Sequence, residues 1–156
     1  MNYVFDNGPF SRLKHYYPTV FKSVWAGLEQ LIEEGAVVST KEVWTELQNG
    51  EPNKHVHPWL KARKHIFTVP SAKELGMVGQ ILAVPHFQAI IGEKQRLRGT
   101  PVADPFVVAA AWARDAAVVT EEQHKPNASK IPNVCEHFKV RYLSLEEFMA
   151  EQGWTF

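Results

Sequence analysis

Short hydrophobic runs alternate with helically spaced apolar residues along this chain. The runs are rich in β-branched and aromatic residues, and they predict strands at residues 3–6, 36–39, 66–69, 117–120 and 140–143. Apolar residues recurring every three or four positions predict helices near residues 18–34, 40–50, 71–82, 86–98, 104–112 and 144–149. Residues 51–64, with a short helix, and residues 121–139 are polar and predict loops. Strands separated by helices favour a parallel sheet with helices on both faces.

Local signals indicate where some of these elements begin and end. Residues 7–9 have the sequence Asn-Gly-Pro, which predicts a turn after the first strand. Asp104 followed by Pro105 predicts a helix with Asp as N-cap and Pro as its first residue. Ser144 with Glu147 three residues later predicts a capping box. The expected fold is therefore an α/β domain with about five parallel strands.

Composition narrows the class of protein. The 156 residues fit one domain, 1–156, and 45% hydrophobic content supplies an ordinary core. Cys135 is the only cysteine, so no internal disulfide forms and a reducing compartment is expected. No apolar run approaches the roughly 18 residues of a membrane span, and Asp6 interrupts any signal-like start. A cytoplasmic location follows as the expectation. The 17 basic and 17 acidic residues argue against a general nucleic-acid coat protein.

Acidic residues stand where the predicted strands end. Asp6 closes the first strand, and Asp104 opens a helix. The other acids in such positions are Glu42 and Glu46 after the second strand, and Glu121 and Glu122 after the fourth. Because the carboxyl ends of parallel strands share one edge of the sheet, these acids are expected to converge there.

Converging carboxylates repel one another unless a cation lies between them. Mg²⁺ prefers oxygen ligands, and such an ion stabilises charge on a phosphate undergoing hydrolysis. Each acid also has a simpler explanation: Asp104 as a helix cap, Glu42 as an exposed residue near a helix start, and Glu121 with Glu122 as a solvated loop. Asp6 is harder to explain in this way, because a charge that closes a buried strand needs a partner.

Several segments, in this order, resemble one protein family. They are residues 3–10 (Tyr-Val-Phe-Asp-Asn-Gly-Pro-Phe), the Ser-Thr-x5-Glu-Leu stretch ending at Leu47, residues 102–111 (Val-Ala-Asp-Pro-Phe-Val-Val-Ala-Ala-Ala), residues 118–122 (Val-Val-Thr-Glu-Glu), and the closing stretches 131–135 and 140–149. Together they resemble the PIN (PilT N-terminus) superfamily, particularly a PIN-like family of uncharacterised proteins akin to VapC toxins. The resemblance spans nearly the whole chain.

The resemblance implies a three-layer αβα sandwich and an endoribonuclease that uses Mg²⁺ or Mn²⁺. It also implies a toxin paired with a small antitoxin, and a homodimer for which Val78, Ile81 and Ile90 could supply an apolar face. By position, the family's four acids match Asp6, Glu46, Asp104 and Glu122, with Glu42 and Glu121 as further possible metal ligands. Hydrolysis would leave a 5′-phosphate and a 3′-hydroxyl.

Two positions depart from the family pattern. Glu122 stands where Asp is common, and Asn7 stands where Ser or Thr often follows the first Asp. These changes place a second metal in more doubt than the first. Asn7 or Thr120 could orient a water or a phosphate oxygen.

RNA would have to be held outside the acidic centre. Lys94, Arg96 and Arg98 precede Asp104 and are the first candidates, although an ordinary solvated helix face explains them too. A second basic stretch, residues 54–73, is the other candidate.

Histidines and the cysteine offer other chemistry. His55, His57 and His65 could bind zinc, but their spacing is loose and no cysteine is near, so a polar loop is favoured. Cys135 is expected to be a buried core residue.

Two other functions remain open. The glutamates at the fourth acidic position and the missing Ser or Thr after Asp6 support an alternative, a catalytically weak PIN-fold module that binds RNA or protein. An unrelated α/β enzyme, such as a phosphatase, also places acids at strand ends. The glycine-rich phosphate loop of nucleotide hydrolases is missing from the sequence, which argues against an NTPase.

Overall fold

Five parallel strands form the centre of the molecule. The computed structural model describes residues 1–90 and 102–156. The strands are β1 (Tyr3–Phe5), β2 (Val37–Thr40), β3 (Phe67–Thr68), β4 (Ala117–Val119) and β5 (Tyr142–Leu143). They lie in the order β3-β2-β1-β4-β5, with every neighbouring pair parallel. The predicted parallel sheet of about five strands is therefore confirmed.

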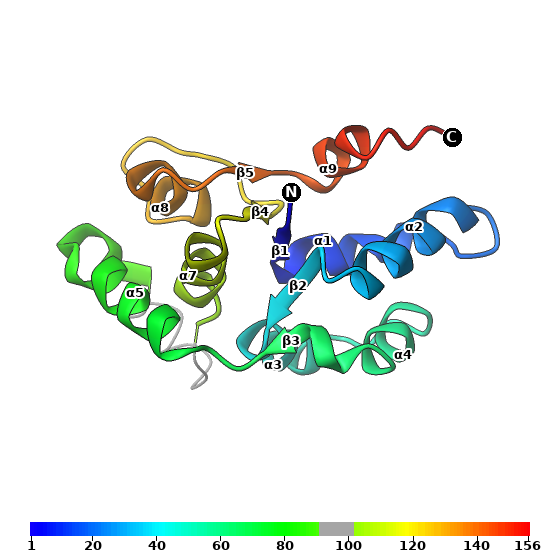
Figure 1. The fold of residues 1–156 in the computed structure, drawn as a ribbon, viewed down its shortest axis with the longest axis horizontal. Coiled ribbons are helices and arrows are strands. Elements are labelled where there is room, and N and C mark those ends of the chain that lie inside the picture. The colour runs from blue at the N-terminus through cyan, green and yellow to red at the C-terminus, as the bar shows by residue number, and fades with distance from the viewer. Residues whose placement is uncertain (91–101) are drawn as a thin grey trace.

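Helices cover both faces of this sheet. They are α1 (Asn7–Arg12), α2 (Lys22–Glu33), α3 (Lys41–Asn49), α4 (Val56–Lys61), α5 (Ala72–Ala83), α7 (Asp104–Arg114), α8 (Ile131–Phe138) and α9 (Leu145–Glu151), with 3₁₀ turns η1 (Leu13–His15), η2 (Lys64–Ile66) and η3 (Pro85–Gln88). Figure 1 shows α5, α7 and α8 on one side of the strands and α1, α2, α4 and α9 on the other. The arrangement is the expected three-layer αβα sandwich.

Strand β1 is buried on both faces. Tyr3 and Phe5 pack edge-on against Phe148 of α9, with ring centroids 4.8 and 5.1 Å apart, and Phe5 also contacts Phe10 of α1 at 5.2 Å. Val4 points to the opposite face, since successive strand residues alternate, and α7 contacts β1 there. A continuous apolar run is what a central parallel strand requires.

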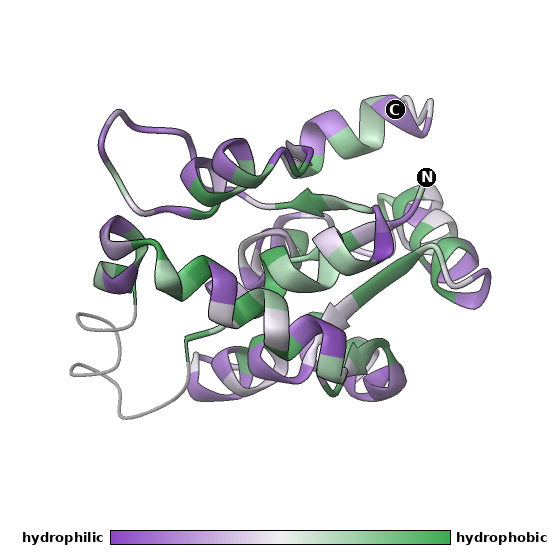
Figure 2. Ribbon diagram, turned by 60° about the vertical axis from the view of Figure 1, so that its left-hand side comes forward, coloured by the Kyte–Doolittle hydropathy of each residue, from purple (hydrophilic) through white to green (hydrophobic). Residues whose placement is uncertain are grey.

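Helix α7 crosses β1, β2 and β4 at close range because its inner residues are small. Residues 107–111, Val-Val-Ala-Ala-Ala, have no exposed surface. The strands and α7 are drawn mostly in the hydrophobic colour of Figure 2, whereas the loop between β4 and α8 is hydrophilic. A helix that connects parallel strands runs antiparallel to them, so the first residue of α7 lies near their carboxyl ends.

Two predicted loops are wrong, and proline is the reason for both. Residues 7–9 begin α1, with Pro9 in its first turn. Residues 131–138 form α8, with Pro132 at its second position. Proline is tolerated in the first turn of a helix, because the amide hydrogen that it lacks has no partner inside the helix. The sequence signal for a turn was here a signal for a helix start.

Other boundaries differ by a few residues. Helix α2 begins at Lys22 rather than at residue 18, which leaves Val20 at 69% exposure. Asp104 is the first residue of α7, and Ala103 takes the N-cap position predicted for Asp104. The capping box of Ser144 and Glu147 is confirmed. Most of the helix predicted over residues 86–98 lies outside the described residues.

The apolar face expected for a homodimer is buried within the chain. Val78, Ile81 and Ile90 are 8%, 0% and 4% exposed, and α5 packs against α7. These side chains therefore contribute to the core, and that choice of dimer face is wrong. Across residues 1–90 and 102–156, no helix combines the length and the apolar character needed to cross a membrane.

Candidate metal centre

The strand order reverses between β1 and β4. The chain moves outward from β1 to β2 and β3, and then crosses to β4 on the other side of β1. Loops at the carboxyl ends of two such strands diverge, and ligands of open α/β folds bind in the crevice between them. Asp6 follows β1 directly, and its amide donates a hydrogen bond to the carbonyl of Val119 in β4, at 2.9 Å. Asp6 is thus fixed at the mouth of this crevice.

Three carboxylates from separate elements meet at this point. Asp6, Glu46 and Asp104 each offer an oxygen that lies within 4.8 Å of the others. Asp6 and Asp104 are 5% and 4% exposed, and Glu46 is partly buried. They come from the end of β1, the middle of α3 and the first residue of α7, so the predicted convergence of these acids occurs in space.

Short connections place two of these acids. Thr40 ends β2 and caps α3 at once, because its hydroxyl oxygen accepts a hydrogen bond from the amide of Val43 at 3.3 Å. Glu46 then lies in the second turn of a helix that starts at the sheet edge. Asp104 reaches the same edge because α7 begins there.

The electrostatic environment of Asp6 is strongly negative. The pKa of Asp6 is raised from 3.8 to about 8, with burial as the main cause and the charges of Asp104, Glu122 and Glu46 as further causes in that order. The backbone amide of Asn7 has the opposite effect on this pKa. A site that disfavours its own ionised carboxylate in this way favours a cation.

Two polar side chains hold the carboxylates in place. The Thr120 hydroxyl donates to Oδ2 of Asp6 at 3.1 Å, and its oxygen accepts from the amide of Glu122 at 3.1 Å. The Asn7 amide donates to Oε1 of Glu46 at 3.3 Å. Asn7 and Thr120 thus contact the acids themselves, whereas the sequence led us to expect that they orient a water or a phosphate oxygen.

Glu122 and Glu121 differ in their surroundings. Both line a cavity of about 490 Å³ that also contains the three clustered acids. The charge of Glu122 acts on Asp6, although Glu122 is not one of the three acids whose oxygens cluster. Oε1 of Glu121 accepts a hydrogen bond from the amide of Leu145 at 3.2 Å, which ties the end of β4 to α9.

Gly8 allows α1 to approach Glu121 closely. A Cβ atom on Gly8 would lie 3.2 Å from Cβ of Glu121. The wall of the cavity is therefore tight at this point, and a larger residue would displace Glu121.

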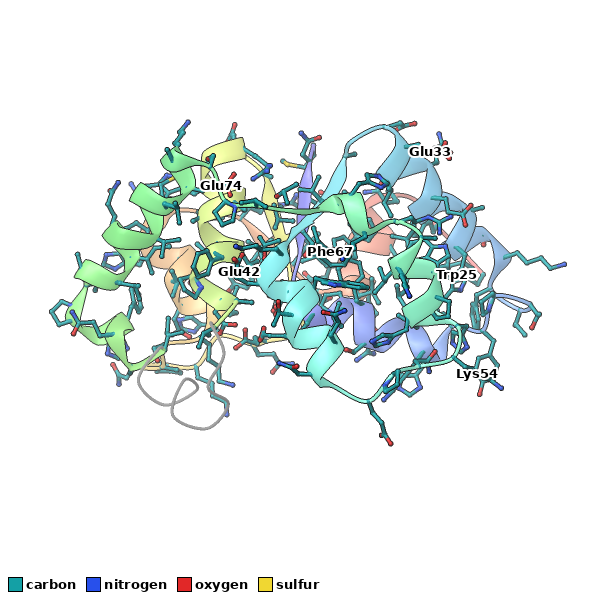
Figure 3. All side chains as sticks on the ribbon, turned by 90° about the horizontal axis from the view of Figure 1, so that it is seen from below. Trp25, Glu33, Glu42, Lys54, Phe67 and Glu74 are labelled. Carbon is teal, nitrogen blue, oxygen red and sulfur yellow. The ribbon has the colours of Figure 1, made fainter. Side chains whose placement is uncertain are left out.

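Glu42 lies away from the cluster. It is 5% exposed rather than an exposed surface residue, and its Oε1 has no hydrogen-bond partner within residues 1–90 and 102–156. Burial is the main cause that raises its pKa. Figure 3 shows Glu42 on the side of α3 that faces Glu74, at the start of α5. One helical turn thus separates an acid in the crevice, Glu46, from one that faces Glu74 (Figure 3).

Basic residues near the centre come from a loop that the sequence did not single out. Lys125 and Lys130 line the metal cavity, together with Gln123. No periodic pattern marks a loop lysine as close to a site. The predicted RNA contacts Lys94, Arg96 and Arg98 lie outside the described residues. In the other basic stretch, Arg63 is paired with Glu29 at 2.9 Å.

His55 and His57 contact backbone groups, and Cys135 lies in the core. Nε2 of His55 lies 3.1 Å from the carbonyl oxygen of Lys14, and both ring nitrogens of His57 contact backbone groups. Cys135 is fully buried, as expected, and burial raises the pKa of its thiol.

Comparisons with known proteins agree with the geometry. A family model described as a domain of unknown function (DUF4411) matches residues 3–156. No curated protein matches the sequence. VapBC2 of Rickettsia felis, solved bound to a DNA fragment from its promoter, is similar in structure, with a TM-score of 0.52, 16% identity, and coverage of 92% of this chain and 98% of that one.

Two further solved structures resemble the chain. PAE2754 of Pyrobaculum aerophilum has a TM-score of 0.50 and 14% identity, covering 97% of this chain and 94% of that one. VapBC-1 of nontypeable Haemophilus influenzae has a TM-score of 0.51 and 12% identity, covering 94% and 99%. At such low identity the likeness concerns the fold alone, and this is the PIN-like fold that the sequence resemblance implied. The chain belongs to the DUF4411 family and has a PIN-like fold.

Proposed function

We propose that this protein is a single-domain, metal-dependent endoribonuclease, spanning residues 1–156, that hydrolyses RNA with Mg²⁺ or Mn²⁺. The observation that carries the proposal is the meeting of Asp6, Glu46 and Asp104, with oxygens within 4.8 Å of one another, at the strand-order reversal of a PIN-like fold.

The acids present fit such an ion. Carboxylate oxygens are the ligands that Mg²⁺ prefers, and oxygens of one octahedral shell, each at 2.0–2.1 Å from the ion, lie about 3–4 Å apart. The three acids are already close to this spacing. The raised pKa of Asp6 also supports a bound cation, because a cation would remove the repulsion between carboxylates that causes part of the increase.

Each residue of the crevice has a role in this proposal. Bound Mg²⁺ or Mn²⁺ supplies Lewis-acid stabilisation of the charge that builds on a phosphate during hydrolysis. Thr120 and Asn7 orient Asp6 and Glu46. Glu122 extends the acidic wall and would hold a water molecule by hydrogen bonding. Lys125 and Lys130 would offset the charge of the RNA backbone.

We further propose that the protein acts as the toxin of a toxin–antitoxin pair in the cytoplasm. Two of the similar structures are of VapBC assemblies. Together with the sequence resemblance, this supports a small antitoxin as partner. Co-expression with the adjacent gene should relieve growth arrest, and Asp104→Asn should remove the arrest without the partner.

The direct test is a metal-dependent ribonuclease assay with matched variants. Glu46→Gln should lower RNA cleavage by ~10²–10³-fold, because a lost ligand weakens both metal binding and stabilisation of the transition state. Glu33→Gln, the same change at an exposed position of α2, should leave cleavage unchanged. Equal rates for the two variants would contradict the proposal.

The second candidate function is an RNA- or protein-binding module of low activity. Glu122 supports it, since a longer side chain stands at the fourth acidic position. Retained RNA binding with no cleavage in Mg²⁺ or Mn²⁺ would favour this module.

A further inference from the structure

A second cavity opens beside the metal centre. Its volume is about 670 Å³, and it lies between α1, α3 and the loop that leads to α4. It shares Asn7 and Glu46 with the metal cavity, so these two side chains separate the two neighbouring cavities. Sites for small ligands span roughly 300–1,000 Å³, and this cavity is large enough for one nucleotide.

Hydrogen bonds fix the outer wall of this cavity. The amide of Asn53 donates to Nδ1 of His57 at 3.3 Å, so Nδ1 is an acceptor. Nε2 of His57 must then carry the hydrogen, which it donates to the carbonyl of Leu47 at 3.1 Å. A neutral histidine thus ties the loop to the end of α3, and the wall is formed in advance of any ligand.

The side chain of Asn53 stabilises the same loop through two further hydrogen bonds. Oδ1 of Asn53 accepts hydrogen bonds from the amides of His55 and Val56, at 3.0 and 3.1 Å. With that oxygen engaged, the amide nitrogen is the group through which Asn53 can donate to a ligand in the cavity that it lines.

The lining has the chemistry of a base and its phosphate. Leu47 and Val56 contribute apolar surface, which suits the face of a ring. Ser11 and Asn53 offer hydrogen-bonding groups for a ring edge, and Lys14 is an exposed cation at the rim. Base edges require donors and acceptors, and a backbone phosphate requires a positive charge.

Cavities continue on the other side of the metal centre. A third one, of about 390 Å³, shares Asp104, Glu122 and Lys130 with the metal cavity. The metal cavity therefore has two neighbouring cavities, one lined by Lys14 and the other by Lys130, which also lines the metal cavity. This layout fits an extended strand whose phosphate crosses the centre.

We infer that the cavity between α1, α3 and the α3–α4 loop binds the base of a nucleotide adjacent to the scissile phosphate of single-stranded RNA, while Lys14 contacts the backbone. The inference rests on the proposed function, which places a phosphate at Asp6, Glu46 and Asp104. The RNA must be single-stranded here, because a base that is stacked and paired in a helix cannot enter a cavity.

Filling the cavity gives the first test. Ser11→Trp places a large side chain in it, and Ser23→Trp is the matched control on the exposed surface of α2. Binding of a labelled single-stranded octaribonucleotide is measured by fluorescence anisotropy in EDTA, where cleavage is prevented. Ser11→Trp should weaken binding ~10-fold, as expected for loss of one bound base, and Ser23→Trp should not. Equal affinities, or no RNA binding by the parent, would overturn the inference.

An abasic nucleotide, moved along the same oligonucleotide, gives the second test. At one position the missing base should weaken binding to the parent, and Ser11→Trp should remove this sensitivity, because both changes delete the same contact. A positional effect that persists in Ser11→Trp would overturn the inference. Lys14→Gln should reduce the salt dependence of binding by about one phosphate, and Lys22→Gln, at an exposed position of α2, should not.

A substrate without bases separates this inference from the proposed function. Mn²⁺-dependent cleavage of an octaribonucleotide in which every nucleotide is abasic measures the metal centre without a ring that could enter the cavity. If the proposed function is wrong, the parent does not hydrolyse this substrate. The anisotropy measurements in EDTA still test whether the cavity binds a base. Ser11→Trp should lose less rate on the abasic substrate than on the octaribonucleotide with bases, and Ser23→Trp should cleave both at the parental rate. A loss equal to the loss of RNA binding would overturn the inference, since the cavity would then be part of the centre.

Discussion

Buried acids occur in two regions of this protein, and their neighbours differ. Glu74 on α5 is 6% exposed, and Nη1 of Arg114 lies 2.8 Å from its Oε1. Asp6 is buried to the same degree, but its neighbours are Asp104, Glu122 and Glu46, and burial together with their charges raises its pKa. An acid paired with arginine joins two helices, whereas an acid placed among acids destabilises the fold in return for a place to bind a cation.

The largest expected effect breaks the metal centre. Asp104→Asn keeps the size of the side chain but removes a charge, so cleavage of RNA should fall by ~10³-fold, equivalent to about 4 kcal/mol. Asp115→Asn, at the other end of α7, is the control and should cleave RNA normally. Single-turnover rates with saturating Mn²⁺ provide the measurement. Parental rates in Asp104→Asn would show that this acid is not a ligand.

The second prediction concerns the ion pair between Arg114 and Glu74. Arg114→Met leaves Glu74 buried without its cation, which should lower the free energy of unfolding by about 2–3 kcal/mol. Urea unfolding measures this change. Activity per folded molecule should stay parental, because Arg114 contacts Glu74 and Thr68 rather than the crevice. A loss of activity without a loss of stability would make the comparison of the two regions wrong.

A smaller effect concerns pH and separates the two kinds of acid. In the folded protein Asp6 has a pKa of about 8, against 3.8 as its ordinary value. Between about pH 4 and pH 8 the unfolded chain releases the Asp6 proton and the folded chain retains it. The free energy of unfolding of the metal-free protein should therefore fall across this window and level off above it. Adding Mn²⁺ at pH 8 should restore stability.

Asp6→Asn supplies the control for that titration. Denaturant unfolding in EDTA at pH 5 and pH 8 should show a smaller decline in the variant than in the parent, because the titrating group is gone. The variant should also gain less stability from Mn²⁺. Identical pH dependence in the two proteins would mean that the pKa of Asp6 is not raised in the folded protein.

The smallest effect tests how the ligands are oriented. Thr120→Val removes the hydroxyl that donates to Asp6 and should reduce cleavage ~5- to 10-fold, in line with about 1 kcal/mol for one hydrogen bond. Thr45→Val removes an exposed hydroxyl that donates to the carbonyl of Lys41, and activity should be unchanged. The ratio of the two rates is the measurement, and a ratio near one would contradict a positioning role for Thr120.

The strands and the converging acids could be predicted because they follow from simple periodicities. Continuous apolar runs mark buried parallel strands, and the carboxyl ends of such strands share an edge, so Asp6 and Asp104 were expected to meet. The choice between Glu42 and Glu46 was harder, since both lie on α3 one turn apart. Position in the resembling family favoured Glu46, and the rotation of α3 on the sheet places it in the crevice.

Other features have no local signal in the sequence. Pro9 belongs to a predicted turn and Pro132 to a predicted loop, although each lies in the first turn of a helix. Lys125 and Lys130 reach the metal cavity through the path of a loop, which no periodicity encodes. The neighbouring cavity depends on His57 bridging two backbone segments, a contact that exists only once α3 and α4 are packed.

The central claim is that Asp6, Glu46 and Asp104 together bind a divalent cation. Crystals soaked in Mn²⁺ and measured near the manganese absorption edge test it most directly. The account predicts an anomalous peak within about 2.0–2.4 Å of at least one oxygen from each of these three acids. Peaks elsewhere, or none at saturating Mn²⁺ with the three side chains ordered, would contradict it.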